Sequence, residues 1–578
     1  MEKRWTYKPL PHTTEERFVI EELSKALNIN PFLATLLWQR GIIDFDTARH
    51  YFRPELSHLH DPMLMQDMDR AVTRLSEAIQ KGEKIMVYGD YDVDGTTSVA
   101  MFYGFLHNRY QNLAFYIPDR YKEGYGVSKA GVEFARDNGF TLIITLDCGI
   151  KSVELVKQAS EWGIDFIICD HHRPGDEIPP AVAVLDPKRH DCSYPFKELT
   201  GCGVGFKLLQ SYCQHHDIDE QEHLFPFLDL LVVSIAADIV PIVGENRVLA
   251  YFGLKQLNAS PRIGLKALKD VAGFQGEMDI SNVVFGLGPR INAAGRIKHA
   301  HDAVQLLLVD NHDDAFGFAA EINKHNTDRR GYDTRMTQEA LTMIEEDEWL
   351  RNAKTTVLFR PDWHKGVIGI VASRCIEKYH RPTIILTQSD TKLAGSARSV
   401  PGFDLYDAIE ACSDLLEQFG GHTFAAGLTL YEENLTAFRQ KFEAIVTERI
   451  LPEQLSPLIE VDMKLPLRNI TERFFNIINQ MQPFGPSNMT PVFVSENVRL
   501  RGYPRILKEK HLKIEVCQDD SPVFIGIGFG MADFYEPLME GRPFHICYLI
   551  EINEFQGKRS LQLHLKDIKF GELPIQKP

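Results

Sequence analysis

The sequence predicts an α/β protein: a parallel-sheet core, a second α/β domain joined to it by a long helix, and a C-terminal β-barrel. Three short and nearly continuous apolar runs predict the core, at 84–89, 142–146 and 165–169. Such runs are typical of strands that are buried on both faces. The helix-like segment 153–162 separates two of them. Strand–helix–strand repeats build parallel sheets, in which ligands bind beyond the carboxyl ends of the strands.

The other elements follow from local composition. Apolar pairs at helical spacing in the N-terminal segment predict helices there. The polar segment 313–349 lacks proline, which predicts a long connecting helix. Short β-rich runs after residue 458 predict a small barrel. We therefore expect a helical N-terminal segment, a core, a connecting helix, a second α/β domain and a barrel at 1–66, 67–310, 311–350, 351–451 and 452–578, respectively.

Each apolar run of the core ends in side chains that can bind a metal. They are Asp90, Asp92 and Asp94 after the first run, Asp147 after the second, and Asp170, His171 and His172 after the third. Carboxylates this close together repel one another unless a cation neutralises them, and divalent ions with oxygen ligands commonly do so. The alternative for the first segment alone is an Asp-rich surface turn. Recurrence of the pattern at three strand ends favours a metal site at one rim of the sheet.

A fourth segment, 224–243, is strongly apolar and about as long as a membrane span. Because Pro226, Asp229 and Asp238 interrupt it, we expect a buried core helix. Asp238 lies in an Ala-Ala-Asp-Ile-Val-Pro context, where an unpaired carboxylate is costly to bury. Its partner is either a local arginine or hydroxyl group, or the same metal cluster.

Four motifs at these positions resemble those of the DHH phosphoesterase family. They are Gly-Asp-Tyr-Asp-Val-Asp-Gly at 89–95, Leu-Asp-Cys-Gly at 146–149, Asp-His-His at 170–172 and Ala-Asp-Ile-Val-Pro at 237–241. Segments 194–197, 201–205 and 289–296 are similar to intermediate motifs of the single-strand-specific exonucleases of that family. Segment 420–427 matches the signature of the DHH-associated domain that follows the core in the family. The resemblance covers nearly the whole chain.

The resemblance implies a 5′ to 3′ exonuclease that acts on single-stranded DNA, releases mononucleotides and has roles in DNA recombination and repair. The alternatives are a nanoRNase or cyclic dinucleotide phosphodiesterase of the same family, or a non-catalytic single-strand-binding relative. The length and the C-terminal barrel disfavour the small-substrate enzymes, and the intact acidic motifs disfavour the non-catalytic relative.

The family's metal site carries over to matching positions of this chain. The resemblance implies two divalent ions, with Mn²⁺ preferred over Mg²⁺, and five ligands: Asp92, Asp94, Asp147, His171 and Asp238. Asp147 would be the bridging ligand. Asp90 and His172 would be catalytic neighbours that add ligands or contact the phosphate. Some relatives have histidine where this chain has Tyr88, so the role of Tyr88 stays open.

Two metal ions can activate water and stabilise a leaving oxygen, so no cysteine or serine nucleophile is required. We expect the hydroxyls of Thr96, Thr97 and Ser98 to cap the following helix instead.

The resemblance also implies residues that bind phosphate and DNA: Arg120, Arg290, Arg296, Ser396, Arg398, Gly420, Gly421 and His422. Arginine suits this role because its planar guanidinium binds two oxygens at once. Adjacent glycines let backbone amides approach an anion closely. The alternative is that the Gly-Gly pair only ends a helix.

By the same resemblance the barrel would be an OB-fold that binds nucleic acid. Aromatic side chains such as Phe493, Tyr503 and Phe555 could stack on bases without reading them. The alternative is that these aromatics belong to the barrel core.

Composition is consistent with a multidomain globular protein, with 578 residues, 44% hydrophobic and 25% charged. The net charge of −17 argues against a nucleic-acid partner unless metals neutralise the acids and basic residues cluster locally, as at 501–513. Nine scattered cysteines and the lack of a secretory signal favour a cytoplasmic protein with reduced thiols. We expect single-stranded DNA as partner, with a single-strand-binding protein and a helicase implied by family, no membrane association and a monomer.

Overall fold

The computed structural model describes residues 2–555 and 557–572 and divides into two compact units. The larger unit contains residues 60–240 and 252–457. The smaller unit combines residues 1–59 and 241–251 with the chain from 458 onward. The five consecutive segments expected from sequence stay a prediction. None of the helices in the described part of the chain has both the length and the apolar character needed to cross a bilayer.

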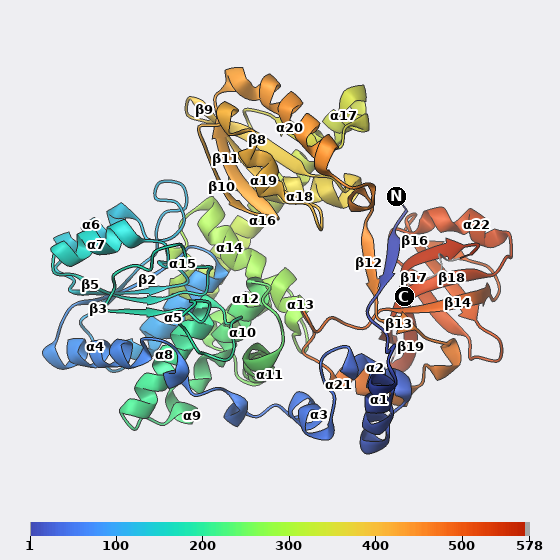
Figure 1. The fold of residues 1–578 in the computed structure, drawn as a ribbon, viewed down its shortest axis with the longest axis horizontal. Helices are drawn as coiled ribbons and strands as arrows, with labels where there is room; N and C mark the ends of the chain where they lie inside the picture. Colours follow the sequence, from blue (N-terminus) through green and yellow to red (C-terminus); the bar gives the residue numbers. More distant parts are fainter. Residues whose placement is uncertain (1, 556, 573–578) are drawn as a thin grey trace. The chain divides into compact units, whose positions relative to one another are not determined.

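The core of the larger unit is a parallel sheet of five strands in the order β3-β2-β4-β5-β6 (Figure 1). Its strands are β2 (Ile85–Gly89), β3 (Leu113–Tyr116), β4 (Leu142–Leu146), β5 (Asp165–Cys169) and β6 (Ala183–Leu185). The three apolar runs form the adjacent central strands β2, β4 and β5, which pair in parallel. The predicted parallel core is confirmed, and the carboxyl ends of these strands meet at one edge.

Helices cover both faces of this sheet (Figure 1). They are α4 (Met68–Lys81), α5 (Val93–His107), α6 (Lys129–Asp137), α7 (Val153–Glu161) and α8 (Gly201–His215). A further helix, α10 (Leu228–Ala237), lies beyond α5. Helices α6 and α7 pack on the face that carries Met86, Ile143 and Ile168. Helices α5 and α8 pack together, and the buried helix α10 packs on α5, as expected for the apolar segment around it.

Helix α5 begins directly after the first acidic motif. Asp92 caps it, because its Oδ1 accepts a hydrogen bond from the amide of Gly95 at 3.1 Å. The hydroxyls of Thr96, Thr97 and Ser98 instead donate to backbone carbonyls four residues earlier, at 2.6–2.7 Å. The prediction that they cap the helix is therefore wrong, since a carboxylate already occupies that position.

The predicted connecting helix is α16 (His312–Glu346), which is 35 residues long. At a rise of 1.5 Å per residue it spans roughly 50 Å. It packs against α12 (Ile263–Val271), α14 (Gly288–Ile297) and α15 (His301–Leu308), and also against α18 (Ile368–Tyr379) of the next domain.

The second α/β domain contains a mixed sheet in the order β10-β11-β9-β8-β7. Its strands are β7 (Thr356–Phe359), β8 (Thr383–Ser389), β9 (Lys392–Arg398), β10 (Gln418–His422) and β11 (Ala425–Leu430). Its remaining helices are α17 (Glu348–Asn352), α19 (Leu405–Glu410) and α20 (Leu435–Arg449). The Gly-Gly pair lies within the edge strand β10, so the alternative that it ends a helix is wrong.

The smaller unit contains the expected helices α1 (Thr14–Leu27), α2 (Pro31–Trp38) and α3 (Phe45–Phe52), together with α21 (Glu472–Gln480) and α22 (Tyr535–Met539). Its main sheet has the order β13-β14-β18-β19-β17-β16-β15. Because β14 pairs with both β18 and β16, five strands close into the predicted OB-type barrel. The strands are β13 (Met463–Lys464), β14 (Phe493–Leu500), β15 (Arg505–Leu507), β16 (His511–Cys517), β17 (Phe524–Gly528), β18 (Phe544–Phe555) and β19 (Lys558–Phe570).

An additional strand links the two ends of the chain in this unit. β1 (Arg4–Tyr7) pairs in parallel with β12 (Leu458–Val461), which the sequence did not indicate. Of the aromatics considered for base stacking, Phe493 is fully buried in the barrel core, whereas Tyr503 is 78% exposed. The side chain of Phe555 lies outside the described residues.

Candidate metal centre

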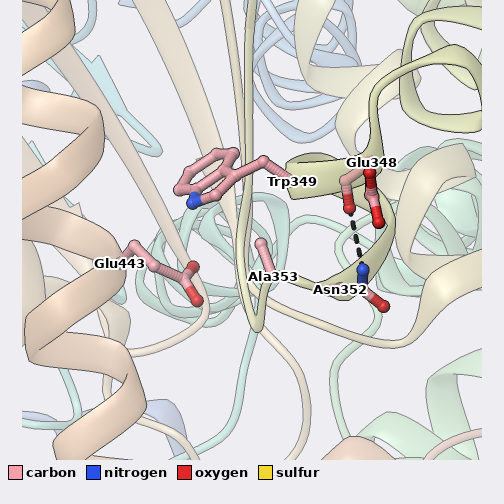
Figure 2. A pocket seen from close by; sticks show the side chains of 5 residues that line it. All are labelled: Glu348, Trp349, Asn352, Ala353 and Glu443. Carbon is pink, nitrogen blue, oxygen red and sulfur yellow. Dashed lines mark hydrogen bonds between the residues drawn. The ribbon is translucent and has the colours of Figure 1, made fainter.

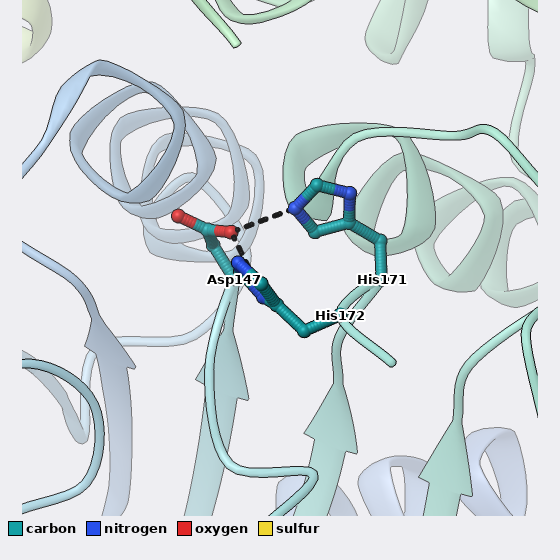
Figure 3. Close-up of side chains that lie close together, drawn as sticks. All are labelled: Asp147, His171 and His172. Carbon is teal, nitrogen blue, oxygen red and sulfur yellow. Dashed lines mark ion pairs between the residues drawn. The ribbon is translucent and has the colours of Figure 1, made fainter. Parts of the chain in front are cut away.

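The loops after β4 and β5 bring three potential ligands together. Figure 3 shows Asp147 facing both imidazole rings. Asp147 Oδ1 lies 3.2 Å from His171 Nε2 and 3.9 Å from His172 Nδ1. These groups therefore lie at the carboxyl edge of the sheet, where the strand pattern predicts them.

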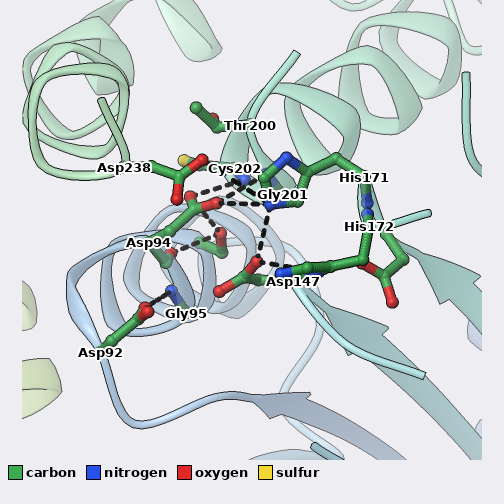
Figure 4. A network of polar contacts seen from close by, with 12 residues as sticks. Asp92, Asp94, Gly95, Asp147, His171, His172, Thr200, Gly201, Cys202 and Asp238 are labelled. Carbon is green, nitrogen blue, oxygen red and sulfur yellow. Dashed lines mark hydrogen bonds and ion pairs between the residues drawn. The ribbon is translucent and has the colours of Figure 1, made fainter. Parts of the chain in front are cut away.

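Two more carboxylates reach the same point from helices (Figure 4). His171 Nε2 is 3.7 Å from Asp94 Oδ2, in the first turn of α5, and 3.7 Å from Asp238 Oδ2, directly after α10. Three overlapping groups have ligand atoms within 4.8 Å of one another: Asp147, His171 and His172; Asp94, His171 and Asp238; and Asp90, Asp92 and Asp147. The structure thus brings together all five expected ligands and both expected neighbours.

Asp94 is held in place by groups from two other helices. Its carboxylate accepts hydrogen bonds from the amides of Gly201 and Cys202 at 2.7 and 3.0 Å, and from Ser234 Oγ at 2.6 Å. The sequence motifs did not indicate these partners. Ser234 precedes Asp238 by four residues and so lies on the same face of α10, which is the one signal that could have found it.

Asp170 belongs to none of the three ligand groups and instead positions His172. Its Oδ1 lies 2.8 Å from His172 Nδ1, and its Oδ2 accepts from the amide of Ile150 at 2.9 Å. Burial opposes ionisation of Asp170, but these contacts outweigh it and lower its pKa to about 2. Burial likewise opposes protonation of His172, yet the Asp170 carboxylate raises the pKa of His172 to about 9.

The remaining carboxylates have the electrostatics of a metal site. Burial, and then mutual repulsion, raise the pKa values of Asp90, Asp92 and Asp147, and raise the pKa of Asp238 to about 8. Both ring nitrogens of His171 and Oδ2 of Asp90 are buried without a hydrogen-bond partner. Such orphaned atoms are rare in folded proteins. A mixed carboxylate and imidazole set of this kind fits Mn²⁺ or Mg²⁺.

Two tyrosines near the centre have distinct contacts. The hydroxyl of Tyr125 donates to the Asp147 carbonyl at 3.0 Å and lies 3.1 Å from His172 Nε2. Tyr88 is buried, and its hydroxyl donates to the Gly126 carbonyl at 3.0 Å. Tyr88 therefore supports the loop that carries Tyr125, a residue that the sequence analysis did not single out.

Arg120 lies beside the acidic cluster, and two more of the expected phosphate-binding arginines, Arg296 and Arg398, lie close to Arg120. Arg120 lies over the ring of Tyr91 at 4.7 Å, and its charge favours ionisation of Asp90 and Asp92. Burial, and then the charge of Arg120, lower the pKa of Arg398 and lower that of Arg296 to about 10. Among the described residues none of these three half-buried arginines forms an ion pair with a carboxylate.

Arg398 shares a sheet with four of the other expected phosphate-binding residues, whereas Arg290 lies elsewhere. Ser396 and Arg398 lie on β9, and the register through β11 aligns them with Gly420 and His422 of β10, respectively. At the intervening Gly421 an added Cβ would lie 2.3 Å from the Ala425 carbonyl oxygen, so the strand requires glycine there. Arg290 lies apart on α14, where its Nε donates to Asn323 Oδ1 of α16 at 2.9 Å.

A separate pocket lies in the second α/β domain, next to α17 (Figure 2). It is lined by Glu348, Trp349, Asn352, Ala353 and Glu443, and Asn352 donates to the Glu348 carbonyl at 2.9 Å. None of the residues expected to bind metal or phosphate lines this pocket, so it does not belong to the metal centre.

Fold and site together define a metal-dependent phosphoesterase of the DHH class. Models of the DHH family N-terminal domain, the DHHA1 domain and the RecJ OB domain match residues 84–235, 352–448 and 461–567. The single-stranded-DNA-specific exonuclease RecJ of Bacillus subtilis (strain 168) is 37% identical over 557 residues, which cover 96% of this chain and 70% of that protein. This chain belongs to the RecJ family of single-stranded-DNA-specific exonucleases.

Solved structures agree with this assignment. RecJ from Thermus thermophilus in complex with Mn²⁺ has a TM-score of 0.84 at 28% identity, and the match covers 99% of this chain and 80% of that one. The complex of the same protein with Mg²⁺ has a TM-score of 0.79 at 26% identity and covers 99% and 79% of the two chains. Structures of this family therefore contain either ion.

We expect divalent cations to stabilise the protein, and to do so more strongly at higher pH. The pKa of an aspartate in the unfolded chain is about 4. In the folded protein, burial and the neighbouring carboxylates raise the pKa of Asp238 to about 8. Metal-free protein should thus lose stability as pH rises between these values, by about 1.4 kcal/mol for each pKa unit. Thermal unfolding with Mn²⁺ and with EDTA, at pH 6 and pH 8, tests this. Equal shifts in Tm at both pH values would contradict it.

Proposed function

We propose that this chain degrades single-stranded DNA from the 5′ end and releases mononucleotides by metal-dependent phosphodiester hydrolysis. The observation that carries the proposal is the juxtaposition of two opposite charge clusters. Buried carboxylates and imidazoles converge at the sheet edge, and Arg120, Arg296 and Arg398 lie nearby without carboxylate partners among the described residues. This arrangement suits a phosphodiester. Metal ions bound at the acidic cluster and the guanidinium groups of the arginines would both contact its anionic oxygens.

Asp92, Asp94, Asp147, His171 and Asp238 are the proposed ligands of two divalent ions. When bound, these ions would neutralise the phosphate, activate a water and stabilise the leaving oxygen. Asp147 shares ligand groups with Asp90 and Asp92 on one side and with both histidines on the other, which supports a bridging role. An imidazole ligand favours Mn²⁺ over Mg²⁺, since Mg²⁺ prefers oxygen.

The chain's own residues would orient the phosphate. The Asp170 carboxylate raises the pKa of His172, which favours the protonated ring that would donate to a nonbridging phosphate oxygen. Tyr125 contacts both Asp147 and His172 and would keep this ring in place. Three hydrogen bonds fix the Asp94 carboxylate, so this proposed ligand keeps a constant position in the site.

Ser396, Arg398, Gly420, Gly421 and His422 are proposed to bind the 5′-terminal phosphate, and thereby to set the direction of digestion. We expect Arg398→Ala to raise KM for a 5′-phosphorylated strand about 10- to 100-fold, because a charged hydrogen bond contributes roughly 1.5–3 kcal/mol. Steady-state assays should show little effect on a strand with a 5′-hydroxyl.

The matched control is Arg360→Ala, a partly exposed arginine of the same domain that pairs with Asp362 at 3.1 Å. It should leave both KM values unchanged. If Arg398→Ala raises KM equally for both strands, the guanidinium does not read the terminal phosphate.

One assay separates the proposed activity from its alternatives. The protein is incubated with a labelled single strand, the matching duplex and a dinucleotide, with and without Mn²⁺. Release of mononucleotides from the 5′ end of the single strand alone supports the proposal. Hydrolysis confined to the dinucleotide would point to a small-substrate phosphodiesterase, and retention of DNA without cleavage would point to a binding protein. A single-strand-binding protein and a helicase stay predicted partners, and a monomer stays the predicted state.

A further inference from the structure

The buried face of α16 changes from apolar to polar at its centre. Helical residues three or four positions apart share a face. The apolar positions are Ala315, Ala319 and Ile322 toward one end, and Met336, Ala340 and Ile344 toward the other. Between them the same face carries Asn326, Arg329 and Asp333. A polar break over two turns of a buried helix face needs partners, because burying polar groups is otherwise unfavourable.

Two of these central side chains have atoms without a hydrogen-bond partner. Asn326 is only 3% exposed, and its Oδ1 is buried without a donor. Arg329 Nε is also buried without an acceptor. Leaving such a group unpaired destabilises the folded protein. A bound anion would accept a hydrogen bond from Arg329 Nε, whereas Asn326 Oδ1 is an acceptor and requires a donor.

The surroundings of this segment are strongly positive. After burial, the charges of Arg330 and Arg329 lower the pKa of Arg290, and Arg329 also contributes to lowering that of Arg296. In the part of the chain that the structure describes, none of these four arginines forms an ion pair within 4 Å. Asp333 is the one carboxylate that favours the charge of Arg329. Arginines gathered in this way repel one another unless an anion lies among them.

We propose that Arg329 and Arg330 form a second phosphate-binding segment, which contacts the backbone of the single strand beyond its 5′-terminal nucleotides. Contact between Arg290 and Asn323 ties this part of α16 to α14, the helix that also carries Arg296. The inference rests on the proposed function. It extends the binding surface from one terminal phosphate to a run of phosphodiesters, so affinity should depend on strand length.

The test is equilibrium binding without turnover. Fluorescence anisotropy in EDTA compares 5′-phosphorylated single strands of 4 and 20 nucleotides at several salt concentrations. We expect the double variant Arg329→Ala, Arg330→Ala to bind the 20-nucleotide strand at least 10-fold more weakly, with a smaller loss for the shorter strand. The slope of log Kd against log salt should fall by about 0.7 for each phosphate that the variant no longer neutralises.

Arg335→Ala is the matched control, because this residue lies on the same helix, is exposed and pairs with Glu339. It should bind like the wild type. Arg329→Lys should keep most of the salt slope, since it keeps the charge. Thermal melts identify any variant that does not fold, in which case Asn326→Asp, which adds a negative charge at the same segment, replaces it.

A lower Tm with unchanged affinity and salt slope would overturn the proposal, and would assign Arg329 to an internal pair with Asp333. Because binding is measured without catalysis, a wild-type protein that binds but does not cleave would contradict the proposed function and leave this inference standing. A wild-type protein whose affinity does not increase with strand length would overturn this inference alone.

Discussion

Asp147→Asn is expected to lower the hydrolysis of single-stranded DNA by on the order of 10³-fold or more. Asp147 belongs to two of the three ligand groups, so its loss weakens both proposed metal positions at once. Asparagine is the better replacement, because Asp147 has a φ of +61°, which asparagine tolerates and alanine does not. The measurement is kcat at saturating Mn²⁺, together with calorimetric titration of Mn²⁺.

The control for this prediction is Asp137→Asn, an exposed carboxylate at the end of α6. It should keep wild-type activity and metal binding. Asp147→Ala should lose activity to the same degree but with additional loss of stability from backbone strain. Appreciable turnover by Asp147→Asn with added Mn²⁺ would refute the two-metal assignment.

Gly201→Ala is expected to reduce activity by about 10²-fold or more although it removes no ligand. An added Cβ would lie 2.5 Å from Asp147 Cβ and 2.6 Å from its Cα, which are distances that cannot be tolerated without movement. The amide of Gly201 also donates to Asp94, so the shift would displace two carboxylates together. A displacement of about 1 Å can cost this much in rate. Mn²⁺ titration and kcat measure the effect.

Gly203→Ala is the control, because it lies on the same helix and its nearest neighbouring atoms, on Leu199, are 3.3 Å from the added Cβ. We expect it to stay within a few-fold of wild type. Far-ultraviolet circular dichroism should show that Gly201→Ala keeps its secondary structure. If Gly201→Ala is as active as Gly203→Ala, the close approach of α8 to Asp147 is not required for catalysis at the metal centre.

Much of the core and its site could be predicted from local patterns. The runs at β2, β4 and β5 are apolar throughout because both faces of these strands are covered, and the parallel topology places their carboxyl ends together. The ligands at these ends could therefore be located without coordinates. Asp238 was less certain, since two partners were open for it, and the structure places it next to His171.

Other features depended on contacts that leave no local signal. Asp229 in the same apolar segment pairs instead with Arg262, at 2.7 Å. The hydroxyls after Asp94 donate to backbone carbonyls of their own helix, and the Gly-Gly pair lies in an edge strand. In each case the residue type allowed two uses, and the choice depended on which distant group lay within reach.

The sequence alone determined the family, the parallel core, the long connecting helix and the metal-binding motifs, because periodicity and short motifs are written along consecutive residues. Only the tertiary structure decided how those motifs are supported. Three examples join segments that are tens to hundreds of residues apart. They are the hydrogen bonds from α8 and Ser234 to Asp94, the pairing of β1 with β12, and the arginines around the centre of α16. Such contacts arise from packing of the whole chain, so no local pattern can specify them.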